Sequence, residues 1–153
     1  MLVLSRQKMP TFDRSVMAPA CGLARGGYVL TETAGKTPEL ILIGTGSELH
    51  LAVDAKAELE KRGHAVRVVS MPSTNLFAKQ DDNYRESVLP AAIRRRLAIE
   101  AGAPETWYRW VGLDGDVVGM TTFGASAPVN DVMKHFGFTL ENVVAHALKL
   151  IER

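Results

Sequence analysis

A glycine-containing turn, Gly44-Thr45-Gly46-Ser47, follows an apolar run and precedes an amphipathic segment. Glycines between a strand and a helix can bring backbone N–H groups close to a pyrophosphate, as in dinucleotide-binding turns. Those turns follow the pattern GxGxxG and place an acidic ribose-binding residue about 20 residues later. Here the third glycine position is Leu49, and residues 66–68 read Val-Arg-Val. The favoured interpretation is a strand-to-helix turn, with Ser47 as the helix N-cap and Glu48 favourable to the helix dipole.

Two further patterns resemble catalytic or metal motifs but lack their defining residues. The stretch GASAP at 124–128 has the spacing of the GxSxG nucleophile elbow, but Pro128 replaces the last glycine. Ser126 is therefore predicted to cap a helix rather than to attack a substrate. The four histidines lack metal-ligand spacing such as HxxxH and are predicted to be structural or solvent-facing. They are His50, His64, His135 and His146.

A basic triplet and an aromatic cluster raise the question of anion or nucleic-acid binding. Arg94, Arg95 and Arg96 precede an apolar run, where a triplet can bind phosphate, but a solvated helix end is favoured. The cluster WYRW at 107–110 has the side chains needed to stack on bases. Because the formal net charge is only +1, we expect the aromatic cluster to pack in the core or at a subunit interface. Nucleic acid is not an expected partner.

The size and composition of the chain indicate one compact globular domain. It has 153 residues, of which 46% are hydrophobic and 23% are charged. Cys21 is the only cysteine, which excludes an internal disulfide and fits a reducing compartment. No stretch approaches the roughly 18 apolar residues of a membrane span, and the N-terminus lacks signal-peptide features. We expect a cytoplasmic protein with no membrane partner.

The order of apolar segments predicts the fold class. An amphipathic helix is expected over 48–62, where Gly63 supplies a stop, and a second over 140–151, where Thr139 caps the first turn. Strand-like runs separate these helices and a polar helical region that Pro90 interrupts. The alternation predicts an α/β fold: a three-layer Rossmann-like open sheet, mostly parallel, with helices on both faces. The expected strands lie within 26–30, 40–44, 65–72, 96–102 and 116–120.

Long stretches of the chain resemble the C-terminal part of transketolases. The resemblance covers nearly the whole chain in order, and a string as long as MPSTNLFAKQDDNYRESVLP is far more specific than a two-glycine turn. It implies that residues 1–25 are the tail of the middle domain and a linker, and that residues 26–153 form the C-terminal α/β domain. The stretches are LVLSRQKMP, GGYVL, LILIGTGSELHLAV, VRVVSMPSTNLFAKQDDNYRESVLP and VGMTTFGASAPVNDVMKHFGFTLENVV.

The resemblance implies the chemistry of the parent enzyme, which transfers a two-carbon ketol unit from a ketose phosphate to an aldose phosphate. The family uses thiamine diphosphate and a divalent metal, Mg or Ca, held mainly by an N-terminal domain, and an activating glutamate on the middle domain. The segment alone is therefore expected to bind no cofactor or metal, to hold no catalytic residue and to be inactive. The stretch GLDGDVVG at 112–119 has the letters of the family's diphosphate motif in the wrong order.

The implied partners are the remaining transketolase domains, a second subunit of a homodimer, and sugar phosphates as substrates of the intact enzyme. Candidate contact surfaces are WYRW and GMTTFGASAP at 119–128. The arginine of the LSRQ stretch contacts the substrate phosphate in the family, and the matching residue is Arg6. This role applies only to the intact enzyme, because the rest of the pocket lies on the middle domain.

Two other functions remain open from the sequence. One is a stand-alone ligand-binding or regulatory module, in which the Gly44–Ser47 turn presents N–H groups to an anion at a helix N-terminus. The other is a split enzyme, in which this chain completes a separately encoded partner.

Overall fold

A central five-stranded sheet organises the computed structural model, which describes residues 8–153. Arg6 lies outside the described residues. The strand order is β1-β3-β2-β4-β5; β1 is antiparallel to β3, and the other neighbours are parallel. The strands are β1 (Tyr28–Glu32), β2 (Leu40–Gly44), β3 (Val66–Ser70), β4 (Arg96–Ile99) and β5 (Asp116–Val118).

The central strand β2 explains why the sheet is covered on both faces. All five of its residues are buried, as expected for a parallel strand between two helical layers. Successive side chains point to opposite faces, so Leu40 and Leu42 join one core cluster while Ile41 and Ile43 join the other. The predicted strand 40–44 is confirmed residue by residue.

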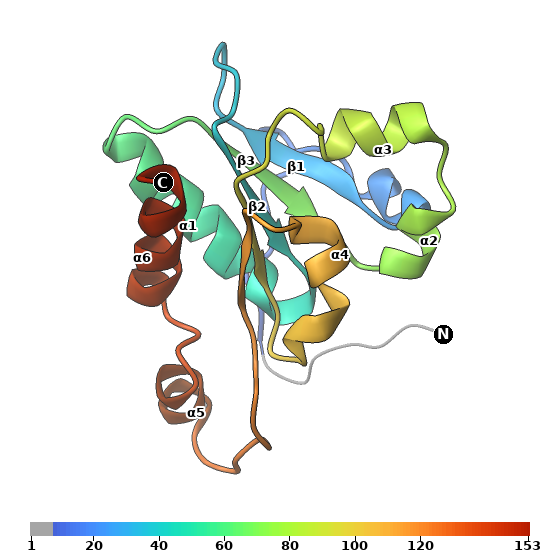
Figure 1. Cartoon of the computed structure of the whole chain (residues 1–153). Coiled ribbons are helices and arrows are strands. Elements are labelled where there is room, and N and C mark those ends of the chain that lie inside the picture. The colour runs from blue at the N-terminus through green and yellow to red at the C-terminus, as the bar shows by residue number, and fades with distance from the viewer. Residues whose placement is uncertain (1–7) are drawn as a thin grey trace.

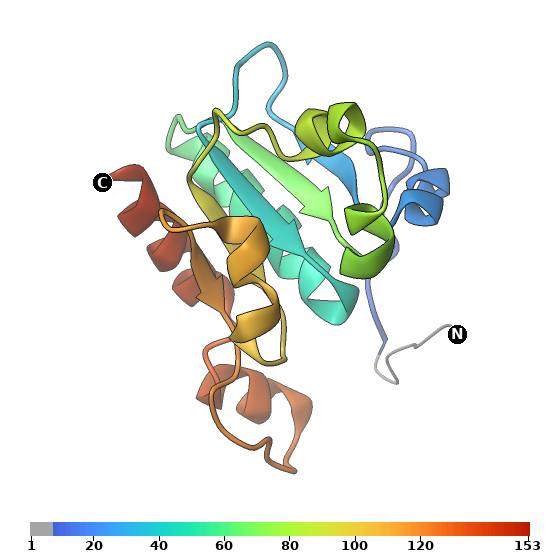
Figure 2. The same cartoon turned by 45° about the vertical axis from the view of Figure 1, so that its right-hand side comes forward.

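The helices form the two outer layers (Figures 1 and 2). The longer helices α1 and α6 cover one face, and α2, α3 and α4 lie on the other, so the predicted three-layer α/β fold is confirmed. The helix α5 lies beyond one end of the sheet. The bounds are α1 (Leu49–Lys61), α2 (Thr74–Ala78), α3 (Asp82–Val88), α4 (Tyr108–Val111), α5 (Val129–His135) and α6 (Leu140–Ile151).

The two long helices have the stop residue and the capping residue that the sequence predicts. The chain leaves α1 through Gly63, whose φ of 94° lies in the left-handed region that favours glycine. The Thr139 hydroxyl accepts a hydrogen bond from the Asn142 N–H at 3.3 Å and so caps α6. Within residues 8–153, no helix is both long and apolar enough to cross a bilayer.

Residues 8–25, which precede β1, pack against the domain rather than extending away from it. It contains a short 3-10 helix, η1 (Ala20–Arg25), and its Phe12 and Met17 side chains contact the core. The Arg25 guanidinium lies 3.5 Å from the centroid of the Tyr84 ring. The division into 1–25 and 26–153 remains a prediction, but the described part of the first segment is fixed to the second.

Gly26 joins these two parts in a conformation that requires glycine. Its φ is 81°, and an added Cβ would lie 2.4 Å from the backbone nitrogen of Phe77. The same Cβ would lie 2.5 Å from the carbonyl oxygen of Ser73. Any side chain at this position would push against backbone atoms of the segment around α2.

Candidate functional site

The carboxyl ends of β2, β3 and β4 meet at one edge of the sheet, where ligands of parallel α/β folds usually bind. The loops that follow these strands enclose a cleft of about 440 Å³, which we call the carboxyl-edge cleft. Its polar side chains offer hydroxyl, amide and carboxylate groups that can hydrogen-bond to a polar ligand or to another protein surface. They are Thr45, Ser73, Thr74, Asn75, Glu100 and Thr106.

A buried tryptophan fixes the carboxylate of this cleft. The Trp107 Nε1–H donates to Glu100 Oε2 at 2.5 Å, and the Trp107 side chain is only 2% exposed. Backbone contacts also hold the loop, because the Gly102 N–H donates to the Glu100 carbonyl at 2.7 Å. Glu100 therefore acts mainly as the acceptor that satisfies the indole inside the fold.

The turn Gly44–Ser47 borders the carboxyl-edge cleft through Thr45. A Cβ at Gly44 would lie 2.8 Å from the Cα of Leu49, so this glycine permits the close approach of β2 and α1. The predicted N-cap role of Ser47 is wrong. The chain continues through a 3-10 turn, η2 (Gly46–Glu48), and the Ser47 hydroxyl donates to Glu48 Oε1 at 2.6 Å instead of capping the backbone.

The side chain of Glu48 places a carboxylate at the start of α1. Its side chain is only 6% exposed, and its Oε2 lies 3.4 Å from the Ala101 N–H. A buried carboxylate therefore occupies the positive end of the helix dipole, where it stabilises the helix and repels a second anion. For this reason the alternative of an anion-binding module at the Gly44–Ser47 turn is not favoured.

Ser126 and the histidines have no catalytic arrangement among the described residues. The predicted cap role of Ser126 is wrong, because α5 begins only at Val129 and Pro128 occupies its N-cap position. His146 Nδ1 lies 2.8 Å from Asp116 Oδ2, and His64 Nδ1 lies 3.0 Å from a carboxylate oxygen of Glu39. These two histidines make structural pairs, as predicted.

The arginine triplet differs from its predicted role as a solvated helix end. It follows a turn rather than a helix, and Arg96 opens β4. The Arg96 guanidinium is partly buried, and burial lowers its pKa from the ordinary arginine value. It donates to four backbone carbonyls, two at 2.8 Å, which join the turn before β4 to the end of α4. The acceptors are Leu89, Pro90, Ile93 and Trp110.

The cluster WYRW divides between the interior and the surface. Trp107 and Trp110 are buried, which confirms the packing interpretation for both indoles. Phe77 and Trp110 have ring centroids 5.2 Å apart, so α2 and α4 meet through aromatic side chains. Tyr108 is 57% exposed and remains available for a contact outside this fold.

Known proteins match nearly the whole length of this chain in sequence. The model of the Transketolase-like TK C-terminal domain matches residues 26–139. Transketolase 2 of Aliivibrio fischeri is 53% identical over 98% of this chain and 22% of its own length, and transketolase 1 of Escherichia coli is 55% identical over the same shares. The structure of Pichia stipitis transketolase with sedoheptulose 7-phosphate has a TM-score of 0.85 at 33% identity, covering 96% of this chain and 20% of that one. The chain thus spans about a fifth of the length of these relatives.

Proposed function

Because this chain belongs to the transketolase family, we propose that it serves as the C-terminal segment of an enzyme that transfers two-carbon ketol units between sugar phosphates. The observation that carries this proposal is the coverage: relatives match 98% of the chain with only 22% of their own length. We further propose that the parent enzyme is a cytoplasmic homodimer. The segment by itself would be inactive and would support the contacts between domains and subunits.

The parent enzyme would use thiamine diphosphate and a divalent metal, but the residues of this chain do not fit that cofactor. Among residues 8–153, no group of three or more His, Cys, Asp or Glu side chains is placed to hold a metal. The Asp-containing stretch 112–119 consists of a turn followed by β5. We therefore assign cofactor binding to the other domains of the parent enzyme.

An exposed segment offers a contact surface for those domains or for the second subunit. Residues 119–128 connect β5 to α5 and extend beyond the end of the sheet (Figures 1 and 2). The Phe123 side chain is 99% exposed and Val129 is 51% exposed. Two large apolar side chains exposed on or next to one projecting segment would become buried if that segment packs against a partner.

A chimera tests the proposed function directly. The matching segment of Escherichia coli transketolase 1 is replaced by residues 1–153 of this chain, and ketol transfer from a ketose phosphate to an aldose phosphate is measured. We expect activity within about tenfold of the parent, which corresponds to less than about 1.4 kcal/mol of lost transition-state stabilisation. A folded chimera with no transfer activity would contradict the proposal.

Phe123→Asp in this chimera is predicted to weaken the assembled enzyme. A carboxylate at a buried contact carries a desolvation cost, so we expect lower activity and partial dissociation in sedimentation measurements. Leu113→Asp is the matched control, because Leu113 is 99% exposed, as Phe123 is, and lies before β5, at the opposite end of that strand from residues 119–128. Equal effects of the two substitutions would show that residues 119–128 are not a specific contact surface.

We also propose that Arg6 contacts the substrate phosphate in the intact enzyme, as the family resemblance implies. The guanidinium fork matches two phosphate oxygens, so Arg6→Gln in the chimera should raise KM for a phosphorylated ketose by about tenfold or more. The kcat/KM for an unphosphorylated ketose should change little, because it lacks the group that Arg6 would bind. A similar loss for both donors would exclude a specific phosphate contact.

A further inference from the structure

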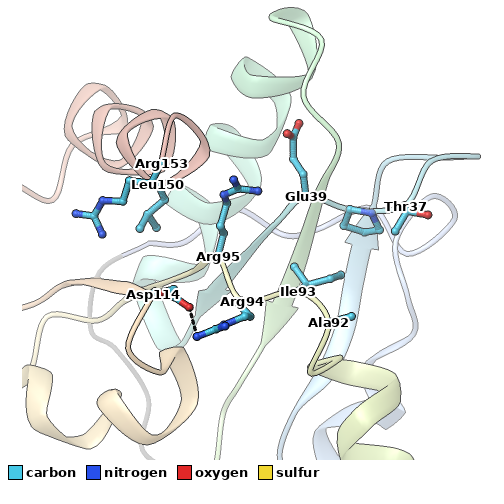
Figure 3. A pocket seen from close by; sticks show the side chains of 10 residues that line it. Thr37, Glu39, Ala92, Ile93, Arg94, Arg95, Asp114, Leu150 and Arg153 are labelled. Carbon is cyan, nitrogen blue, oxygen red and sulfur yellow. Dashed lines mark ion pairs between the residues drawn. The ribbon is translucent and has the colours of Figure 1, made fainter.

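A second hollow lies at the amino edge of the sheet, where β2, β4 and β5 begin. This amino-edge hollow has a volume of about 440 Å³, which is within the range of small-molecule sites. Four parts of the chain form its walls: the segments before β2, β4 and β5, and the end of α6 (Figure 3). Pro38, Ile93 and Leu150 supply apolar wall, and the arginines bring positive charge.

The amino-edge hollow brings three arginines together, and only one of them forms an ion pair with a carboxylate of the lining. Its lining contains Arg94, Arg95 and Arg153 beside the two carboxylates of Glu39 and Asp114. Asp114 forms an ion pair with Arg94 at 2.5 Å (Figure 3). Within residues 8–153, neither Arg95 nor Arg153 has a salt-bridge partner.

Glu39, the other carboxylate of the lining, is already satisfied by neighbours outside the arginine group. Its Oε1 lies 3.0 Å from His64 Nδ1 and accepts from the Ala65 N–H at 3.2 Å. These contacts hold the carboxylate toward the start of β3. Glu39 is therefore engaged away from Arg95, whose guanidinium has no carboxylate partner among residues 8–153.

The backbone that carries Arg95 is held firmly. The Arg95 carbonyl accepts from the Ile41 N–H at 3.0 Å, which fixes it to β2. The next residue, Arg96, ties the same segment to carbonyls of the preceding turn and of α4. A guanidinium mounted on such a segment loses less conformational freedom on binding than one on a mobile loop.

We propose that the amino-edge hollow binds a small phosphorylated metabolite, with Arg95 as the principal phosphate-binding side chain. Arg94 and Arg153 add positive charge at the rim, and the apolar wall receives part of the organic moiety. A planar guanidinium matches phosphate oxygens in both charge and geometry. This site is independent of the proposed ketol transfer, because it is built from residues of this segment alone.

Calorimetric titration of the 153-residue chain with phenyl phosphate and with inorganic phosphate tests the proposal. Sodium chloride at equal ionic strength is the reference that removes non-specific charge effects. We expect binding of both phosphates, and tighter binding of phenyl phosphate because its ring contacts the apolar wall. No binding of either would overturn the proposal, and equal affinities would overturn the assignment of an organic ligand.

Two substitutions with opposite expected effects separate a binding defect from misfolding. Arg95→Gln should weaken phenyl phosphate binding about tenfold, the size expected for one charge-assisted contact. Asp114→Asn should strengthen binding a few-fold, because it removes a competing carboxylate and frees Arg94. Arg109→Gln is the charge-matched control, since exposed Arg109 lies outside the hollow and near the Trp110 ring. Equal loss in Arg95→Gln and Arg109→Gln, or unchanged affinity in Asp114→Asn, would contradict the assigned roles.

Discussion

Replacing Arg96 with methionine is expected to lower the free energy of unfolding by about 3–5 kcal/mol. The methionine side chain fills similar space but donates no hydrogen bond, so four partly buried carbonyls lose a charged donor at once. Each lost bond to a charged group costs about 1 kcal/mol or more when its acceptor stays away from water. The turn before β4 and the end of α4 would also lose their common attachment.

Urea denaturation followed by circular dichroism measures this loss. Arg96→Lys should give an intermediate value, because a single ammonium group keeps the charge but cannot reach all four carbonyls. Arg94→Met is the neighbouring control, with an expected change below about 1 kcal/mol, since Arg94 is 71% exposed and pairs with Asp114 at the surface. Similar midpoints and slopes for Arg96→Met and Arg94→Met would refute the proposed role of Arg96.

Replacing Trp107 with alanine is expected to cost about 3–5 kcal/mol of stability. The indole is almost fully buried in the core cluster that contains Trp110 and Phe77, so its removal leaves a cavity as well as exposed apolar surface. The substitution also removes the N–H donor of Glu100, which leaves a carboxylate without its partner at the base of the carboxyl-edge cleft.

Trp107→Phe separates packing from hydrogen bonding. It keeps most of the buried area and loses the donor, so we expect a smaller cost of about 1–2 kcal/mol. Thermal unfolding and urea denaturation should rank the wild type above Trp107→Phe and both above Trp107→Ala. If Trp107→Ala kept the wild-type midpoint and only changed subunit association, the side chain would belong to an interface instead of the core.

The helices α1 and α6 and all five strands could be predicted from local patterns, because each places apolar residues at the spacing of its own secondary structure. The order of the strands could not. The sequence does not indicate that β3 lies between β1 and β2, or that β1 runs antiparallel, since pairing depends on contacts between distant segments. The resemblance to transketolases indicates the whole fold, whereas the periodicity of apolar residues indicates only its separate helices and strands.

Differences between prediction and structure at the candidate functional positions have two physical causes. Local preference predicts that Ser47 and Ser126 cap helices, but the first hydrogen-bonds to Glu48 and the second lies before the N-cap of α5. The dipole role predicted for Glu48 agrees with the structure, but its burial and the four carbonyl contacts of Arg96 were not predicted, because charged residues are seldom buried and their partners come from separate segments. A signal was available for Arg96, which is followed directly by the apolar residues 97–99 of β4.

The attachment of residues 8–25 to β1 bears on where this polypeptide can be divided. The Ala18 N–H donates to the Leu30 carbonyl at 2.9 Å, and the side chains around it cover part of the outermost strand. An expression fragment cut at Gly26 would leave that strand open to pairing with another molecule. A fragment that begins at residue 26, where the match to the family model begins, would therefore tend to aggregate. A fragment that keeps residues 8–25 would remain soluble.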